Sequence, residues 1–206
     1  MSLIDISRSI SPETAVWPGD RSVEWSWTAQ IKEGSAVNVG GYAMSTHAGT
    51  HADAPRHIAD DGASVDDLPL SSFVGPAEVV DVTGADCIRP EHVKKAAAPR
   101  VLFRTSVSSL PDSEWPEEFP VLDPETVQTL AKQNTVLIGV DTPSVDPVDS
   151  TDLPAHHALR RHGIVNLENL CLEGVAPGRY RLLALPIRLT GGDAAPVRAV
   201  LDDGSP

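Results

Sequence analysis

The sequence has few cysteines and few basic residues, and each shortage excludes a class of protein. Cys87 and Cys171 are its only cysteines, and they lie far apart in a chain of 206 residues. A disulfide framework needs more cysteines in a shorter chain, and a thiolate metal site needs closer spacing. Lys and Arg together number 16 against 29 Asp and Glu, which gives a formal net charge of −13. This charge argues against nucleic acids and anionic membranes as partners, because both attract basic surfaces.

Long apolar runs are also missing. No segment approaches the roughly 18 apolar residues that a membrane-spanning helix requires. The first seven residues show no basic region leading into an apolar one, so we expect no secretory signal and a cytoplasmic protein. A length of 206 residues with 41% hydrophobic residues is enough for one domain over 1–206 with a sizeable core. We expect both cysteines to be buried free thiols.

Short extended segments outnumber helical ones. Helical spacing or a helix-starting proline predicts helices over 90–98, 123–133 and 156–162, with Asp123 as an N-cap. The unbroken apolar run 135–140 predicts a central strand that ends in the polar loop 141–144. Alternation and apolar runs predict the other strands, at 3–10, 22–31, 77–82, 100–105, 166–170, 180–186 and 197–201, with an extended piece after Gly34. The expected fold is a mixed α/β domain with a β-rich core.

The segment from His47 to His57 is the most informative part of the chain. It reads His-Ala-Gly-Thr-His-Ala-Asp-Ala-Pro-Arg-His and places three of the seven histidines beside a carboxylate. Imidazole and carboxylate together are ligands for zinc and similar divalent ions. In an extended strand His47 and His51 would be about 13 Å apart, whereas two nitrogens on one zinc lie about 3–3.5 Å apart. The chain must therefore bend, and Gly49 permits this. We expect a bulged loop, with His51 and Asp53 on one face.

The type of metal site and its remaining ligands stay open at this point. A structural zinc usually has four ligands including cysteine, so nearby carboxylate favours an open, catalytic site. His57 either binds the metal or stands beside it as a proton shuttle. A second group of candidates, His156, His157 and His162, precedes Glu168, and spacing alone does not choose among the three histidines. Scattered core or surface histidines would be the alternative to any metal site.

The motif H-x-G-T-H-x-D-x-P-x-H over 47–57 resembles the signature of the cyclase-like metal-dependent hydrolases. The bacterial members of that family include kynurenine formamidases. Three further features resemble the family in the same order: Trp-Pro-Gly-Asp at 17–20, Asp-Thr-Pro-Ser at 141–144, and a histidine followed twelve residues later by Glu168. The resemblance therefore covers essentially the whole chain.

The resemblance implies an α/β fold with a twisted, barrel-like mixed sheet flanked by helices, in a homodimer or a higher homo-oligomer. It implies two zinc ions per subunit, with Mn, Co or Fe as other ions that such ligands accept. His47, His51 and Asp53 would hold the first ion. Asp53 would bridge to the second, which takes His156, and Glu168 would join the pair.

The resemblance also assigns roles outside the ligand set. His57 falls on the acid/base histidine, and Trp17 on an aromatic residue that contacts substrate. The twelve-residue offset selects His156 over His157. Some members that act on other substrates carry Gln in place of Glu168, so the glutamate favours a formamidase. Trp17 would otherwise be a core or interface residue, and we expect Trp25 and Trp27 to be packing residues.

The implied reaction is hydrolysis of N-formyl-L-kynurenine to L-kynurenine and formate in tryptophan degradation. An alternative within the family is hydrolysis of isatin or another cyclic amide or ester. Two alternatives lie outside it: a non-catalytic metal-binding protein and a small-molecule binding module. A non-catalytic metal-binding protein would not need a proton shuttle at His57. A small-molecule binding module would not explain the spacing of the ligand residues.

Overall fold

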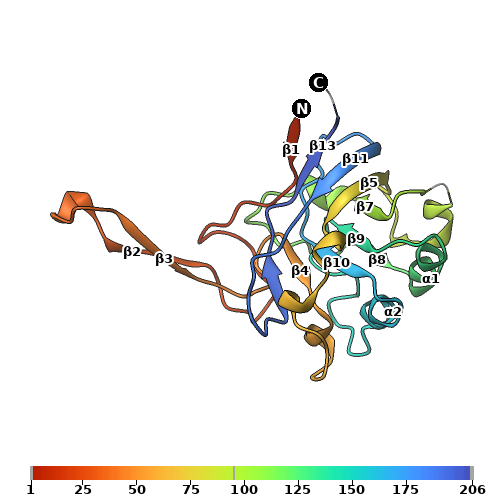
Figure 1. Cartoon of the computed structure of the whole chain (residues 1–206), viewed down its shortest axis with the longest axis horizontal. Coiled ribbons are helices and arrows are strands. Elements are labelled where there is room, and N and C mark those ends of the chain that lie inside the picture. The colour runs from red at the N-terminus through yellow and green to blue at the C-terminus, as the bar shows by residue number, and fades with distance from the viewer. Residues whose placement is uncertain (1, 95, 205–206) are drawn as a thin grey trace.

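A nine-stranded mixed sheet, curled into part of a barrel, runs through the molecule (Figure 1). The computed structural model describes residues 2–94 and 96–204. The strands in spatial order are β1 (Leu3–Asp5), β13 (Val200–Asp202), β11 (Gly178–Leu183), β5 (Val74–Asp81), β7 (Arg100–Arg104), β9 (Leu137–Val140), β10 (Val165–Glu168), β4 (His51–Asp53) and β12 (Ala194–Pro196). The expected α/β fold with a barrel-like mixed sheet is confirmed.

The centre of the sheet is parallel and its flanks are antiparallel. Strands β5, β7, β9 and β10 run parallel, whereas β4, β11, β12 and β13 pair antiparallel. Successive side chains of a strand point to opposite faces, and β7 shows the result. Leu102 packs into the curled interior with Leu182 and Leu201, while Val101 and Phe103 pack on the other face. Apolar residues on both faces bury this part of the sheet completely.

Two helices cover the outer face of the sheet. Helix α1 spans Pro124–Lys132 and α2 spans Pro154–His162, and both lie on the same side of the molecule (Figure 1). Helix α1 begins where the sequence predicts, because the Asp123 side chain accepts a 2.8 Å hydrogen bond from the Glu125 N–H and Pro124 occupies the first helical position. The smaller pair β6 (Cys87–Ile88) and β8 (Val121–Leu122) is parallel.

The helix expected over 90–98 is wrong. A single 3-10 turn spans Pro90–Val93, and the chain then continues to β7 without further helix in its described part. Pro99 gives the physical reason, because a proline disfavours the helical conformation of the residue before it. Lys95 falls outside the described residues. The other 3-10 turns span Ile31–Glu33, Pro55–Ile58, Val65–Asp67, Leu70–Ser72 and Ser106–Ser109.

A two-stranded ribbon of β2 (Glu24–Ala29) and β3 (Val39–Ala43) projects from the body of the molecule (Figure 1). We call residues 21–44 the arm. The expected strands are present, but the expectation that Trp25 and Trp27 pack inside the chain is wrong. Their exposed fractions are 51% and 49%. The ribbon pairs with no other described strand.

Two further expectations concern the cysteines and the membrane. Both cysteines are free thiols, as expected, but each is half-buried and not fully buried. None of the described helices is long and apolar enough to cross a bilayer.

A candidate metal centre

Gly49 makes the bend that the histidine spacing requires. Its φ is +65°, in the left-handed region that glycine adopts without strain. The expected bulged loop is correct only for the turn before His51, because His51–Asp53 form strand β4 between β10 and β12. Both partner strands lie more than a hundred residues away, so local signals could not show the pairing. His51 and Asp53 share a face, with 3.3 Å between Nε2 and Oδ1.

Strand β10 brings a second pair of polar side chains to the same face. In the antiparallel register Glu168 lies opposite His51, and Asn166 lies opposite Asp53. Because side chains alternate along a strand, all four point to one side of the sheet. The apolar residues between them, Ala52 and Leu167, point to the other side and are fully buried in the core. The sheet therefore builds a polar patch on an apolar support.

Three ligand atoms form a nearly equilateral triangle. His47 Nδ1 lies 3.2 Å from His51 Nε2 and 3.2 Å from Asp53 Oδ1, and the remaining side is 3.3 Å. Tetrahedral ligands at the roughly 2.0–2.2 Å bond lengths of zinc are about 3.3 Å apart. The separation of these atoms is therefore the one that a shared metal ion requires.

Hydrogen bonds on the far side of each imidazole fix which nitrogen faces the triangle. His51 Nδ1 donates to the Gly49 carbonyl at 2.9 Å, and His47 Nε2 lies 3.0 Å from Asp193 Oδ2. In neutral rings both inward nitrogens then carry lone pairs. Asp53 Oδ1 is buried and accepts no hydrogen bond. Three acceptors that face one another need a cation between them, so these residues fit a metal ion.

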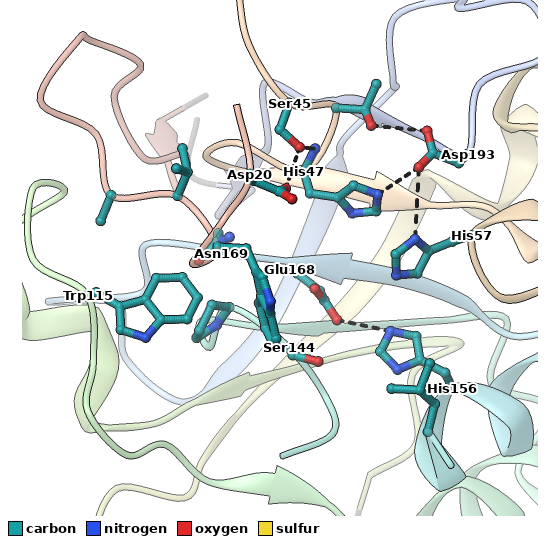
Figure 2. A pocket seen from close by; sticks show the side chains of 16 residues that line it. Asp20, Ser45, His47, His57, Trp115, Ser144, His156, Glu168, Asn169 and Asp193 are labelled. Atoms are coloured by element: carbon teal, nitrogen blue, oxygen red, sulfur yellow. Dashed lines mark hydrogen bonds and ion pairs between the residues drawn. The ribbon is translucent and has the colours of Figure 1, made fainter. Parts of the chain in front are cut away.

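A second group of ligand atoms adjoins the first. His156 Nε2 lies 3.6 Å from Asp53 Oδ2. It also lies 3.5 Å from Glu168 Oε1 (Figure 2). The other glutamate oxygen, Oε2, lies 3.5 Å from His51 Nε2. Each carboxylate therefore presents one oxygen to each group, which is the arrangement of bridging ligands between two ions. Asn166 donates to Asp53 Oδ2 and to Glu168 Oε1, and so orients both carboxylates.

The start of helix α2 determines which of the three C-terminal histidines faces this group. Asp146 accepts hydrogen bonds from the Ala155 and His156 N–H groups and lies 2.7 Å from His156 Nδ1. This carboxylate turns His156 Nε2 toward Asp53 and Glu168. His157 and His162 are exposed residues of the same helix.

The carboxylates make the cluster attractive to positive charge. Burial lowers the pKa of each ligand histidine, but neighbouring carboxylates outweigh burial and raise it. The pKa is about 9 for His47, chiefly through Asp193 and Asp53. The pKa of His51 rises to about 10 and that of His156 to about 12. Burial alone would raise the pKa of the Asp53 carboxyl, but the charge of His51 and close contacts with His156 and His47 hold it well below its usual value.

The chelated protein is expected to lose thermal stability as pH rises. The pKa of His47 is about 9 when folded against 6.5 ordinarily. The folded state therefore binds the proton more tightly, and this stabilisation is complete below pH 6.5 and disappears as pH rises through about 9. His51 acts in the same direction. Thermal unfolding with a chelator across this range measures the effect. Metal-loaded protein is the control, because ions replace the protons. A melting temperature of the chelated protein that rises with pH would contradict this account.

A cavity of about 390 Å³ opens onto the cluster (Figure 2). Its walls include His47, His156 and Glu168 of the cluster, together with Trp17 and Trp115. The two tryptophan rings meet edge to face with centroids 5.4 Å apart. Trp17 therefore lies where a residue that contacts substrate would lie.

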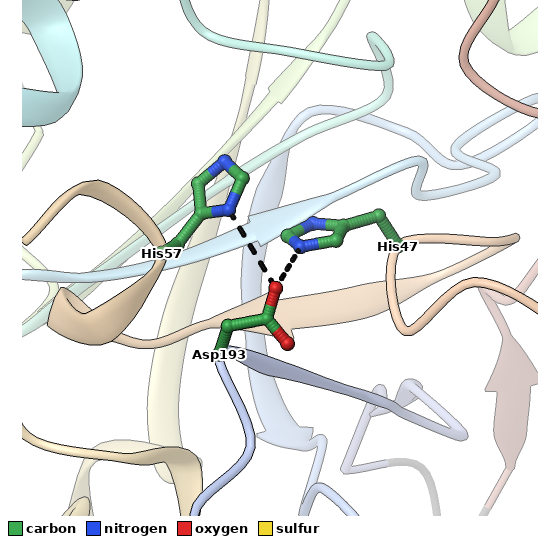
Figure 3. A group of neighbouring side chains, drawn as sticks. All are labelled: His47, His57 and Asp193. Atoms are coloured by element: carbon green, nitrogen blue, oxygen red, sulfur yellow. Dashed lines mark hydrogen bonds and ion pairs between the residues drawn. The ribbon is translucent and has the colours of Figure 1, made fainter. Parts of the chain in front are cut away.

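His57 stands at the edge of the cluster. Pro55 starts the 3-10 turn that carries it, and its Nδ1 lies 3.9 Å from Asp193 Oδ2 (Figure 3). Its ring centroid is 4.2 Å from that of His47, and its side chain is 33% exposed. Burial is the main cause that lowers its pKa, so the imidazole is neutral near pH 7 and is able to accept a proton. His57, His47 and Asp193 also group closely enough to hold an ion, so geometry leaves a ligand role open.

Sequence reasoning missed four residues of this site. Asp193 contacts both His47 and His57, Asp146 orients His156, Asn166 links the two carboxylates, and Trp115 completes the aromatic wall. Asp193 follows the Gly-Gly turn at 191–192, which is the one local signal that could have indicated it. Asn166 became visible through its contact across the sheet, Asp146 through its contact with the start of helix α2, and Trp115 through its contact with Trp17.

Comparison with known proteins places the chain in a family. Residues 4–147 match the family described as "Putative cyclase", which covers more than half of the chain. The chain belongs to the cyclase family. The family inferred from the motifs is therefore confirmed.

Individual members of the cyclase family resemble the chain over nearly its whole length. A kynurenine formamidase from Salinibacter ruber (strain DSM 13855 / M31) is 59% identical over 98% of this chain and 98% of its own. A solved structure described as a potential metal-dependent hydrolase with cyclase activity is 28% identical, with a TM-score of 0.85 over 100% of this chain and 99% of its own. Isatin hydrolase A from Labrenzia aggregata is 25% identical, with a TM-score of 0.84 over 97% and 93%. The chain is an enzyme of the hydrolase class.

Proposed function

We propose that this cyclase-family protein hydrolyses N-formyl-L-kynurenine to L-kynurenine and formate, as a metal-dependent arylformamidase of tryptophan degradation. The observation that carries the proposal is the pair of carboxylates, Asp53 and Glu168, each facing two ligand groups beside a cavity with two tryptophans. The 59% identity to a kynurenine formamidase supports this substrate over others in the family. All 206 residues would form the one hydrolase domain.

Two zinc ions would complete the site. His47, His51 and Asp53 would hold one ion, and His156 with Asp53 and Glu168 would hold the other. Zinc supplies Lewis-acid polarisation of a carbonyl and lowers the pKa of water toward neutrality. The same ligands accept Mn, Co or Fe, so metal analysis must identify the ion.

His57 would move the proton that hydrolysis requires. Water adds to the formyl carbon, the C–N bond breaks, and the amine nitrogen must receive a proton. His57 lines the cavity, and its Nε2 is the ring nitrogen turned away from Asp193 (Figure 3). The lowered pKa keeps the imidazole neutral near pH 7. It would take the proton from the water and return it to the aniline nitrogen.

The tryptophans would bind the aryl ring of the substrate. Trp17 and Trp115 present edge-to-face rings to the cavity, and an aromatic ligand ring adds an offset or edge contact of about 1 kcal/mol to such a pair. An aryl ring bound at the tryptophans would place the formyl group at the cluster, because the tryptophans and His57 line the same cavity.

Hydrolysis of N-formyl-L-kynurenine, followed by absorbance with metal assayed in parallel, tests the proposal. We expect turnover with about two ions per chain, loss of activity on chelation and recovery with zinc. Isatin serves as the comparison substrate, since an isatin hydrolase shares the fold at 25% identity. Two ions with turnover of isatin alone would replace the proposed substrate. Two ions without turnover of either would leave other cyclic amides and esters as substrates.

A further inference from the structure

The two tryptophans of the cavity come from irregular segments of the chain. Trp17 ends the N-terminal segment 8–17, and Trp115 lies near the end of the loop 105–116 that follows strand β7. Within that loop only Ser106–Ser109 is regular, as a 3-10 turn. Neither tryptophan therefore takes its position from a strand or a helix, and other contacts must hold the two rings together.

A buried carboxylate at the edge of the sheet fixes the start of the loop. Asp141 follows strand β9 directly and is fully buried. Its oxygens accept 2.7 Å hydrogen bonds from the N–H and the hydroxyl of Thr105. They also accept hydrogen bonds from the N–H and the hydroxyl of Ser108, at 3.2 and 2.6 Å. This anchor holds one end of the loop, whereas Trp115 lies near the other.

A guanidinium group from the N-terminal segment holds the second half of the loop. The side chain of Arg8 is only 8% exposed, and its Nη1 lies 3.2 Å from Asp112 Oδ1. The same side chain donates to the carbonyls of Leu110, at 2.9 Å, and Val107, at 2.8 Å. A guanidinium with so little access to water needs acceptors from the protein, and the loop supplies them.

Asp112 joins the loop to the N-terminal segment at further points. Its Oδ2 accepts a 2.9 Å hydrogen bond from the Ser9 N–H, and its backbone carbonyl accepts one of 2.8 Å from the Ala15 N–H. Ala15 stands two residues before Trp17, and Asp112 stands three residues before Trp115. These contacts therefore set the distance between the two segments that carry the rings.

Little else holds the second half of the loop. In the part of the chain that the structure describes, residues 110–116 make their hydrogen bonds to segments outside the loop only with residues 8–15. A small cavity of about 20 Å³, enough for about one water molecule, is lined by Arg8, Asp112 and Trp115. Close packing therefore does not fill the space beside the Trp115 ring, and its position depends on the contacts of Arg8 and Asp112.

We propose that Arg8 and Asp112 are positioning residues that give the cavity its affinity for an aryl ring. They act through Trp17 and Trp115, which line the 390 Å³ cavity, whereas Arg8 and Asp112 do not (Figure 2). A bound ring gains an offset or edge contact only while the two indoles keep their mutual geometry. The inference rests on the proposed function, in which these tryptophans bind the aryl ring of the substrate.

Ligands with and without a ring test this role. Asp112→Ala removes the side-chain contacts with Arg8 and Ser9. Isothermal titration calorimetry of the full, metal-loaded chain measures the dissociation constants of L-kynurenine, which carries the ring, and of formate, which does not. We expect Asp112→Ala to raise the dissociation constant of L-kynurenine by about 5- to 10-fold, the usual worth of an aromatic contact. The dissociation constant of formate and the metal content should stay unchanged.

Glu114→Ala is the matched control. Glu114 lies on the same loop, closer to Trp115, and is an exposed residue whose side chain has no partner among the described residues. This substitution removes the same charge without touching the contact with Arg8, so both dissociation constants should stay unchanged. Arg8→Met and the double variant complete a double-mutant cycle. We expect the double variant to bind L-kynurenine no more weakly than the weaker single variant, because the two residues act as a unit.

Three results would overturn the proposal. One is an Asp112→Ala variant that binds L-kynurenine as tightly as the original chain. Another is equal weakening of L-kynurenine and formate, or loss of metal, which would show that the contact supports the whole cluster. The last is full additivity in the double variant. Failure of the proposed function differs from all three: the original chain would bind L-kynurenine without hydrolysing its N-formyl derivative, and calorimetry would still decide the role of Arg8 and Asp112.

Discussion

Replacing Asp53 with Asn is expected to abolish metal binding and activity together. Oδ1 of Asp53 completes the triangle with His47 and His51, and Oδ2 faces His156. One substitution therefore removes a charged ligand from both groups of ligand atoms. Loss of an outer-shell partner alone costs about 10–100-fold in affinity or activity. We expect kcat/KM to fall by more than roughly 100-fold, and the two ions that we propose for the site to be lost together.

Mass spectrometric metal analysis alongside kinetics measures this effect. Asp60→Asn is the matched control, because Asp60 is an exposed carboxylate seven residues further along the same segment. The control should keep its metal and its activity. An Asp53→Asn protein that keeps one ion at full occupancy would show that the two groups bind independently, and one that keeps both would refute a bridging carboxylate.

Replacing His57 with Ala is expected to reduce kcat by about 10²–10⁴-fold, the usual contribution of a positioned acid or base, while metal content stays unchanged. The reason is that His57 lies at the edge of the cluster, with Nδ1 3.9 Å from Asp193, and stands outside the triangle of His47, His51 and Asp53. The imidazole removed is neutral near pH 7, so the variant loses the proton acceptor but no charge.

Measuring both kcat and metal content of the His57→Ala variant distinguishes a proton shuttle from a metal ligand. His157→Ala is the control, since His157 is an exposed histidine of helix α2 and belongs to none of the described ligand groups. Loss of metal with His57→Ala would assign His57 to the ligand set with His47 and Asp193. Unchanged kcat with full metal would exclude the proton-shuttle role.

Local rules predicted those elements whose signals lie within a few residues. Asp123 and Pro124 mark the start of helix α1, and the apolar run at 137–140 marks a buried strand. The helix predicted over 90–98 is wrong, because Pro99 disfavours the helical conformation of the residue before it despite the helix-favouring residues in the segment. The prediction for Trp25 and Trp27 failed because alternation shows which face is aromatic but not whether anything covers that face.

The sequence by itself determined the kinds of ligand, their order and the bend at Gly49, because spacing and glycine conformation are local properties of the chain. Only the tertiary structure decided that His51–Asp53 is a strand, that Glu168 lies opposite His51, and that Asp193 and Asp146 orient the histidines. Most of these contacts join residues far apart in sequence, such as Asn166 and Asp53 at a separation of 113, although Asp146 and His156 are only 10 apart. Strand register is set by how the whole sheet buries its apolar faces, and no short motif contains that information.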